Sequence, residues 1–385
     1  MAASRLDLAT ICALALLAAA AWLVPGPPLL AKQTGETVRA RVVSVDNSGL
    51  SDVGLLKYGS QTLKAEVLEG RFKGETFECA NEVRAQLEFD KIFAPEDVAL
   101  VVVDGKSEPG KSVLVARDHW RLGWMAVLFG AFCVLLCAFG GWTGAKALAS
   151  FVFSCVAIWK VLVPLCLRGW PASWTSFAVV VVMTGAIMVL VAGWTRKGLA
   201  ASLGAALGVF SGLAMAHVFG RLMHVSGATM PFAQSLLYSG FADLDLADLF
   251  IGAVLLAESG AVMDLAMDVA AGVAEVARHN PSLSGLELAR SGLRIGRSVV
   301  GTMTTTLLLA YSGGYLTLLM VFAAQGTAPF DFLNSTLVSA EAVKTLVGSF
   351  SLVLVAPATA FVSAWLMRKG EDFRGAGVDG KEERQ

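Results

Sequence analysis

The stretch from Leu249 to Val276 reads LFIGAVLLAESGAVMDLAMDVAAGVAEV. It is apolar and long enough to form a helix that crosses roughly 30 Å of hydrocarbon. It also carries four acids: Glu258, Asp264, Asp268 and Glu275. An acid near the middle of a spanning helix costs at least roughly 2.5–3.5 kcal/mol on insertion scales, so it normally faces a bundle interior or a wet cavity. The stretch therefore predicts a helical membrane bundle that shelters one acidic helix.

Three of the acids share one face of this helix. At 100° per residue, Asp264, Asp268 and Glu275 fall within about 40° of one another, and Glu258 lies to the side. Two carboxylates at i,i+4 suit a proton relay or a cation bound by oxygen atoms. The alternative is a packing role, in which Arg294, Arg297 or threonine hydroxyls pair with the acids.

Composition supports a membrane protein and excludes several other classes. The 385 residues are 56% hydrophobic and 16% charged, whereas a soluble domain carries about 25% charged residues. The net charge is −1 and no basic stripe is present, so we expect no nucleic-acid partner. No Gly-rich phosphate loop, nucleophile elbow or HExxH motif occurs, so we expect no enzyme, no cofactor and no metal site.

The N-terminal part contains one apolar run and one polar segment. The run Leu6–Val24 predicts a transmembrane anchor within residues 1–30, although a cleaved signal peptide stays open. Residues 31–118 hold short alternating runs separated by Gly and Asn/Asp turns, a pattern typical of a small all-β domain. The runs are Thr37–Val45, Thr62–Leu68, Thr76–Cys79, Val98–Val103 and Ser112–Ala116.

Residues 119–368 contain seven further runs, each long enough to span a bilayer. They are Leu122–Phe139, Ala147–Leu167, Trp174–Trp194, Leu199–Phe219, Leu249–Val276, Val299–Ala324 and Thr345–Leu366. The chain is therefore predicted to be an all-α polytopic membrane protein of about eight transmembrane helices with a small extracytoplasmic all-β domain. Lys and Arg gather in alternate loops and in the tail, residues 369–385, which places both termini in the cytoplasm of a cell-membrane protein.

Two connecting segments are less regular. Residues 226–245 are apolar but interrupted by Pro231 and Gly240, so an interfacial or re-entrant piece is expected there. Arg278–Arg297 is expected to be a cytoplasmic linker with a short helix over Ser284–Arg290.

A hydroxyl-rich segment and a glycine break follow this linker. Thr302, Thr305 and Thr306 could present hydroxyls to a neighbouring helix, or serve as ordinary packing contacts. Tyr311–Gly314 (YSGG) interrupts the same run, as glycines do at binding sites of many transporters, or as a simple kink. Further on, Glu341 and Lys344 are spaced i,i+3 and are expected to pair.

Three stretches resemble the YibE/F-like membrane proteins. They are LLYSGFADLDLADLFIGAVLLAESGAVMDLAMDVA (236–270), GLRIGRSVVGTMTTTLLLAYSGG (292–314) and, in the polar segment, GRFKGETFECANEV (70–83). The resemblance implies the same multi-pass topology, and transport is the activity suggested for that family. The family's recurring positions fall on Asp264, Asp268, Arg297, Gly301, Thr302 and Glu341. The family often has Asp where Ser298 stands and Asn where Thr305 stands.

These observations predict a secondary transporter or permease of unknown substrate, coupled to protons or a cation through Asp264 and Asp268. The remaining candidate pathway residues are Glu258, Arg297, Thr302, Thr305, Thr306 and Glu341. The alternative is a non-transporting scaffold or sensor whose β domain binds an envelope partner. The expected partners are the lipid bilayer and a small solute or ion, and homo-oligomer formation stays open.

Overall fold

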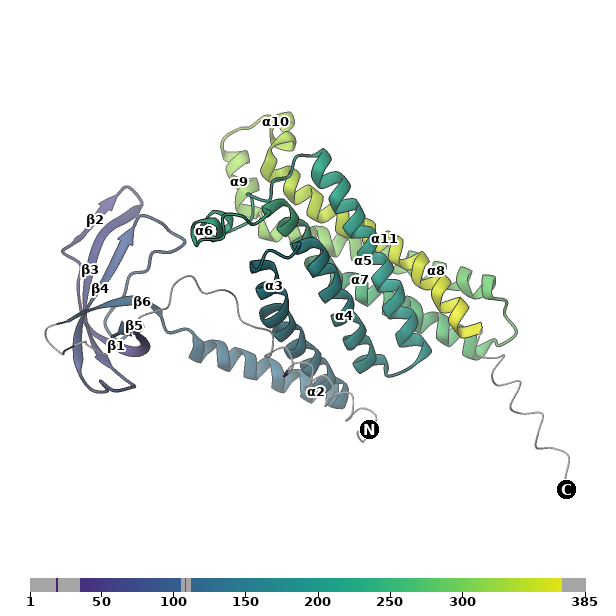
Figure 1. The fold of residues 1–385 in the computed structure, drawn as a ribbon, viewed down its shortest axis with the longest axis horizontal. Coiled ribbons are helices and arrows are strands. Elements are labelled where there is room, and N and C mark those ends of the chain that lie inside the picture. The colour runs from purple at the N-terminus through teal and green to yellow at the C-terminus, as the bar shows by residue number, and fades with distance from the viewer. Residues whose placement is uncertain (1–18, 20–34, 105–107, 109–111, 369–385) are drawn as a thin grey trace, which may run out of the picture. The chain divides into compact units, whose positions relative to one another are not determined.

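The computed structural model describes residues 19, 35–104, 108 and 112–368. The predicted anchor Leu6–Val24 and the tail at 369–385 lie outside these residues, apart from residue 19. The chain divides into two compact units, Ala31–Leu135 and a second one that contains Leu136–Gln385. The predicted combination of an N-terminal β domain and a mostly helical remainder is confirmed (Figure 1).

The β domain is a closed five-stranded barrel with one short additional strand. In the sheet order β1-β5-β6-β4-β3, β1 also pairs with β3 and closes the barrel. All pairs in the barrel are antiparallel except β4 with β6, and β2 extends β3 as a hairpin. The strands are β1 (Glu36–Asp46), β2 (Leu50–Val53), β3 (Leu56–Val67), β4 (Thr76–Arg84), β5 (Val98–Val103) and β6 (Val113–His119).

Alternation of side chains builds the barrel core. In β1, Val38, Ala40 and Val42 are buried, because every second residue of a strand points to the same face. The five alternating runs of the sequence are all strands, and β3 and β4 are longer than predicted. The strand β2 was not predicted, since its four residues include Asp52, a residue type depleted in strands.

A buried amide joins the barrel to the segment after β4. The Gln61 side chain donates to the Phe93 backbone carbonyl (2.8 Å). Its Oε1 accepts from the Phe93 backbone N–H (3.0 Å) and from the Asn81 side-chain Nδ2 (3.2 Å). Cys79 also lies in this core, and burial, with a smaller contribution from the Glu78 charge, raises the pKa of its thiol to about 12.

The remainder of the described chain is helical. Its long helices are α2 (Leu122–Ala157), α4 (Ala172–Ala192), α5 (Arg196–Leu222), α7 (Leu246–His279), α8 (Gly285–Gly314) and α11 (Thr336–Arg368). The shorter elements are the π-helical turn η1 (Ile158–Leu162), α3 (Val163–Leu167), α6 (Ala233–Tyr238), α9 (Leu316–Ala324) and α10 (Pro329–Asn334).

In the described part of the chain, five helices are long and apolar enough to cross a membrane. The bent pair α8–α9 raises this number to six. One of the five is the continuous run Leu122–Leu167, where two spans were predicted. Gly141 lies between those two spans and has non-helical dihedral angles (φ 53°, ψ −128°). The apolar helices suggest a membrane-embedded protein, and the count of eight spans stays a prediction.

Helix α7 lies at the centre of the bundle. It contacts α4, α5, α8 and α11, and α11 also packs against α5 and α8 (Figure 1). Gly204, Gly208 and Gly212 of α5 face α11, where a Cβ atom at Gly204 would overlap Thr359 and one at Gly208 would overlap Val355. The sequence of this part of α5, GLAASLGAALGVFSG (198–212), is rich in Gly and Ala at four-residue steps, a pattern that indicates close helix packing on small residues, and the structure shows that packing.

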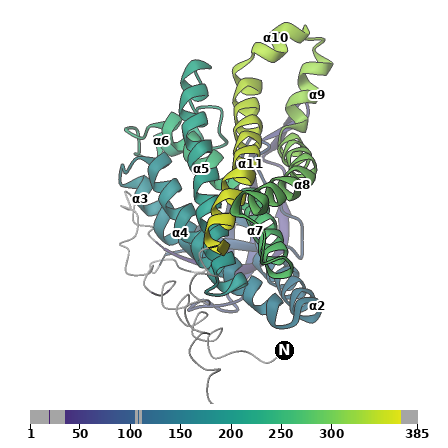
Figure 2. The ribbon, with the colours of Figure 1, turned by 90° about the vertical axis from the view of Figure 1, so that its right-hand side faces the viewer.

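The predicted extent of the linker before α8, Arg278–Arg297, was wrong. The linker is Asn280–Ser284 only, because the Ser284 hydroxyl accepts from the Glu287 amide and the Glu287 carboxylate accepts from the Ser284 amide. This capping box starts α8, so Arg290–Arg297 is helical. The run Val299–Ala324 is not one helix, since α8 and α9 meet at a bend of 65°. Figure 2 shows α9 leading from α8 to α10. The predicted interruption at the YSGG segment is thus confirmed.

The segment 226–245 forms the short helix α6 between turns, and the structure places no long helix there.

Candidate functional site

Glu258 is the acid that the bundle encloses. It lies in the middle third of α7 and its side chain has no exposed surface. Among the residues that the structure describes, neither of its carboxylate oxygens has a hydrogen-bond partner. Nearly all buried polar groups in proteins are hydrogen-bonded, so an isolated carboxylate needs a specific explanation, such as a bound ion, water or proton.

Helices α5 and α11 leave room for this carboxylate by presenting small residues. A Cβ atom at Gly212 of α5 would overlap both the Glu258 carboxylate and the Ser351 hydroxyl. A Cβ atom at Gly348 of α11 would lie 3.7 Å from Glu258 Oε2. The Ser351 hydroxyl, although adjacent, donates to the Val347 carbonyl (3.1 Å). The site is therefore a buried carboxylate beside one hydroxyl, with two glycines around it.

Further polar groups extend this site toward α8 and the start of α11. The Tyr311 and Thr345 hydroxyls are buried and, within the described residues, have no hydrogen-bond partner. Tyr311 of α8 packs against the core cluster that includes residues of α5, α7 and α11. Glu341 pairs with Lys344 at 2.7 Å, both side chains being 22% exposed, as their i,i+3 spacing suggested.

The structure separates Asp264 and Asp268 from Glu258. Both aspartates are exposed, in a stripe of α7 that also contains Ala253, Ala257 and Gly260. The rotation from Glu258 to Asp264 is about 120° around the helix axis, which carries the two acids to different faces. The two aspartates share one face, as predicted, and that face is not the enclosed face that holds Glu258.

The predicted threonine hydroxyls bond to their own helix. Thr302 donates to the Val299 carbonyl (2.9 Å), Thr305 to the Gly301 carbonyl (3.1 Å) and Thr306 to the Thr302 carbonyl (2.9 Å). All three residues are exposed. Their hydroxyls satisfy the local backbone, and the structure brings none of them into the Glu258 site.

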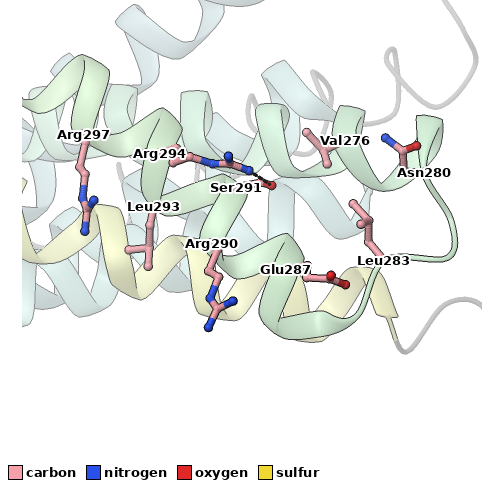
Figure 3. Close-up of a pocket in the computed structure, with 9 residues that line it drawn as sticks. All are labelled: Val276, Asn280, Leu283, Glu287, Arg290, Ser291, Leu293, Arg294 and Arg297. Atoms are coloured by element: carbon pink, nitrogen blue, oxygen red, sulfur yellow. Dashed lines mark hydrogen bonds between the residues drawn. The ribbon is translucent and has the colours of Figure 1, made fainter.

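Arg297 belongs to a different place, a pocket at the junction of α7 and α8. Figure 3 shows Arg297, Arg294, Arg290 and Glu287 following one another along α8 toward its start, with Arg294 turned toward Ser291. Within the described residues, Arg297 forms no ion pair with Asp264 or Asp268. The predicted residues therefore divide into four groups: a buried site, an exposed acidic face, a basic pocket and the exposed threonines of α8.

Sequence reasoning placed Glu258 outside the acidic stripe and did not identify its surroundings. Gly212, Gly348, Ser351 and Tyr311 come from three other helices, so no spacing within α7 could reveal them. One available signal was the four-residue glycine spacing in α5, which indicated a close helix contact without locating the acid that shares it.

The comparisons with known proteins add one result. No curated protein and no solved structure matches this chain. The model of the family described as YibE/F-like protein matches residues 128–369, which include the helices α4 to α11 around the buried acid. The match covers more than half of the chain, and the chain therefore belongs to the YibE/F-like protein family.

Proposed function

We propose that this protein is a membrane permease that moves its solute together with protons or a small cation. The observation that carries the proposal is Glu258, a fully buried carboxylate without a hydrogen-bond partner among the described residues. Ionisable groups inside membrane helices are costly and typically mark ion or substrate pathways. A group that was retained only for packing would be expected to have its hydrogen bonds satisfied.

In this proposal Glu258 binds the coupling ion, and its neighbours shape the site. Gly212 and Gly348 leave space next to the carboxylate, and Ser351 and Tyr311 offer oxygen atoms to a cation or a hydroxyl to a proton path. The 65° bend after Gly314 follows Tyr311 by about one turn, and broken helices accompany ion sites in transporters. Asp264 and Asp268 lie farther along α7 on a different face and are not part of this ion site.

The test measures ion binding directly and needs no knowledge of the solute. The purified, detergent-solubilised chain is unfolded by heat across a pH series and a panel of monovalent and divalent cations. Binding to the folded state stabilises it by about 2.7 kcal/mol when the free ion is at 100 times Kd. We expect one ion, or a step in the pH series, to stabilise wild type.

Variants then assign the effect to a residue. Glu258→Gln keeps the shape of the side chain and should lose the ion- or pH-dependent stabilisation. Glu275→Gln is the matched control, because Glu275 lies at the exposed end of α7 and pairs with Arg278. The double variant Asp264→Asn/Asp268→Asn tests the coupling role that the sequence predicted for the two aspartates. An identical response of wild type and Glu258→Gln to every ion and pH would refute the proposal.

A second function, a scaffold or sensor that binds an envelope partner through the β domain, has one observation in its favour. Exposed apolar side chains gather near the β2–β3 turn and after β4, where Tyr58 pairs with Arg84 in the ladder. They are Leu55, Tyr58, Leu87 and Phe89. Exposed apolar patches typically mark interaction sites. Deleting residues 35–118 should abolish partner capture by a scaffold, whereas a permease would keep its ion-dependent stabilisation.

A further inference from the structure

The pocket at the junction of α7 and α8 has the features of an anion site, which is separate from the buried acid. Its volume is about 700 Å³, within the range of roughly 300–1,000 Å³ that ligand pockets occupy. Three arginines line it (Figure 3): Arg290, Arg294 and Arg297. They are spaced i, i+4 and i+7 along α8, so they project from one side of the helix within about 60°.

The arginines of this pocket are not neutralised locally. Within the described residues, Arg290, Arg294 and Arg297 form no ion pair, and Arg294 donates only to the Ser291 hydroxyl (3.2 Å). The one acid of the lining, Glu287, accepts from the Ser284 amide and hydroxyl at 2.8 Å each. Three guanidinium groups and one carboxylate leave a formal local charge of about +2. Such a surplus favours a bound anion.

The remaining lining narrows the class of anion. The Asn280 amide and the Ser291 hydroxyl add neutral hydrogen-bonding groups, while Val276, Leu283 and Leu293 form an apolar wall. Guanidinium groups bind phosphate in bidentate geometry more effectively than ammonium groups do. An apolar wall next to phosphate-binding donors suits a molecule in which a phosphate is attached to a hydrocarbon part, as in a phospholipid. Basic pockets between helices at a membrane boundary bind such headgroups.

We propose that Arg290, Arg294 and Arg297 form a binding site for a phosphate group, supplied by the headgroup of an anionic membrane lipid. The site lies where α7 ends and α8 begins, so a lipid that is bound there ties the two central helices together. Free phosphate has the same chemistry without the hydrocarbon part, and the experiment separates the two sources.

The experiment uses the full-length chain, purified in detergent and stripped of lipid. Native mass spectrometry counts retained lipids after addition of phosphatidylglycerol or phosphatidylcholine, and thermal unfolding is measured with the same lipids and with inorganic phosphate. We expect wild type to retain phosphatidylglycerol in preference to phosphatidylcholine, with a half-saturating concentration at least tenfold lower. Stabilisation by inorganic phosphate alone, lost in the pocket variant, would support the phosphate site but overturn its assignment to a lipid.

The variants test the pocket rather than general charge. Arg290→Gln/Arg294→Gln/Arg297→Gln should bind phosphatidylglycerol at least tenfold more weakly. The control Arg196→Gln/Arg278→Gln/Arg368→Gln removes three arginines outside the pocket, from the start of α5 and the ends of α7 and α11, and should bind like wild type. Arg290→Lys/Arg294→Lys/Arg297→Lys keeps the charge but loses the fork geometry of the guanidinium groups, so its affinity for phosphatidylglycerol should lie between those of wild type and the Gln variant. This Lys variant replaces the Gln variant in the test if the Gln variant does not fold. Equal weakening in the pocket and control variants, or no headgroup preference in wild type, would overturn the proposal.

Discussion

Replacing Glu258 by methionine should stabilise the protein while removing its ion response. Methionine is unbranched and of similar length, so it fits between Gly212 and Gly348 without a large cavity or a new clash. The substitution removes a buried carboxylate that has no hydrogen-bond partner among the described residues. If Glu258 is an ion-binding residue, the substitution should raise the stability of the folded chain. If Glu258 instead holds the helices together, the same substitution should lower that stability.

The magnitude follows from the desolvation of the carboxyl group. A buried polar group without a partner costs about 1–3 kcal/mol, and more if it is charged. In a folding unit of this size, 1 kcal/mol shifts Tm by about 2–4 °C. Glu258→Met should therefore raise Tm by about 2–12 °C in a buffer without the stabilising cation or, if the ion is a proton, at a pH above the stabilising step. The carboxyl group stays uncompensated there, so the comparison measures its cost alone.

The assay is thermal unfolding of the detergent-solubilised chain, followed by intrinsic tryptophan fluorescence. Glu275→Met serves as the control, because Glu275 is exposed and pairs only with Arg278 and His279. Its expected effect on the free energy of unfolding is within about 0.5 kcal/mol. A fall in Tm for Glu258→Met, with wild-type stability in Glu258→Gln, would show that the carboxamide or carboxyl holds the helices together and would refute the ion-site reasoning.

Three other predictions follow from the packing and the chemistry of single positions. Gly204→Ala should lower the free energy of unfolding by about 1–3 kcal/mol, because its Cβ would lie 2.9 Å from the Thr359 Cα. Gly220→Ala in the same helix is the control, since its Cβ would meet no atom within 4 Å. Thermal unfolding compares the two variants, and equal stability would contradict the α5–α11 contact. Cys79 should react slowly with iodoacetamide at pH 8 in the folded chain and faster as pH rises, because its raised pKa of about 12 keeps the thiol protonated below that value. Peptide mapping by mass spectrometry measures the rate of labelling, and rapid labelling of the folded chain at pH 8 would contradict the prediction. In a background without native cysteines, a membrane-impermeant maleimide added to intact cells should label Lys57→Cys in the β domain and leave Arg278→Cys unlabelled, and the opposite pattern would reverse the predicted orientation.

The sequence predicted those helices and strands in which the pattern of apolar and polar side chains follows directly from which face is buried. The strands β1 and β5 alternate because each has one buried face, and the apolar runs of α4 and α5 lack interior charges. It failed on the extent of α8: the short helix predicted over Ser284–Arg290 continues in the structure through Arg294 and Arg297 to Gly314. The predicted start agrees with the Ser284–Glu287 capping box, whereas the arginines, which lie on the polar side of that helix, favoured a linker.

The candidate site was less accessible to sequence reasoning, and the reason is physical. Helical geometry placed Asp264 and Asp268 on one face correctly, but only the packing of α5 and α11 decides which face of α7 is enclosed. Gly212, Gly348 and Ser351 lie far from Glu258 in the chain, and their effect on its burial appears only when the helices are assembled. Periodicity within one helix identifies which residues share a face, but it does not identify which other helices pack against that face.

The closure of the barrel by the β1–β3 pairing has a consequence for how the β domain meets other proteins. An exposed strand edge offers unpaired amides and carbonyls to any extended chain, which promotes aggregation and strand exchange. Within the described residues, each of the five main strands pairs with a neighbour on both sides, although β4 and β6 share only three residue pairs, and β2, four residues long, has one partner strand. The described barrel therefore offers little long edge for an added strand, so we expect recognition of the β domain to depend mainly on side chains, where sequence rather than backbone sets selectivity.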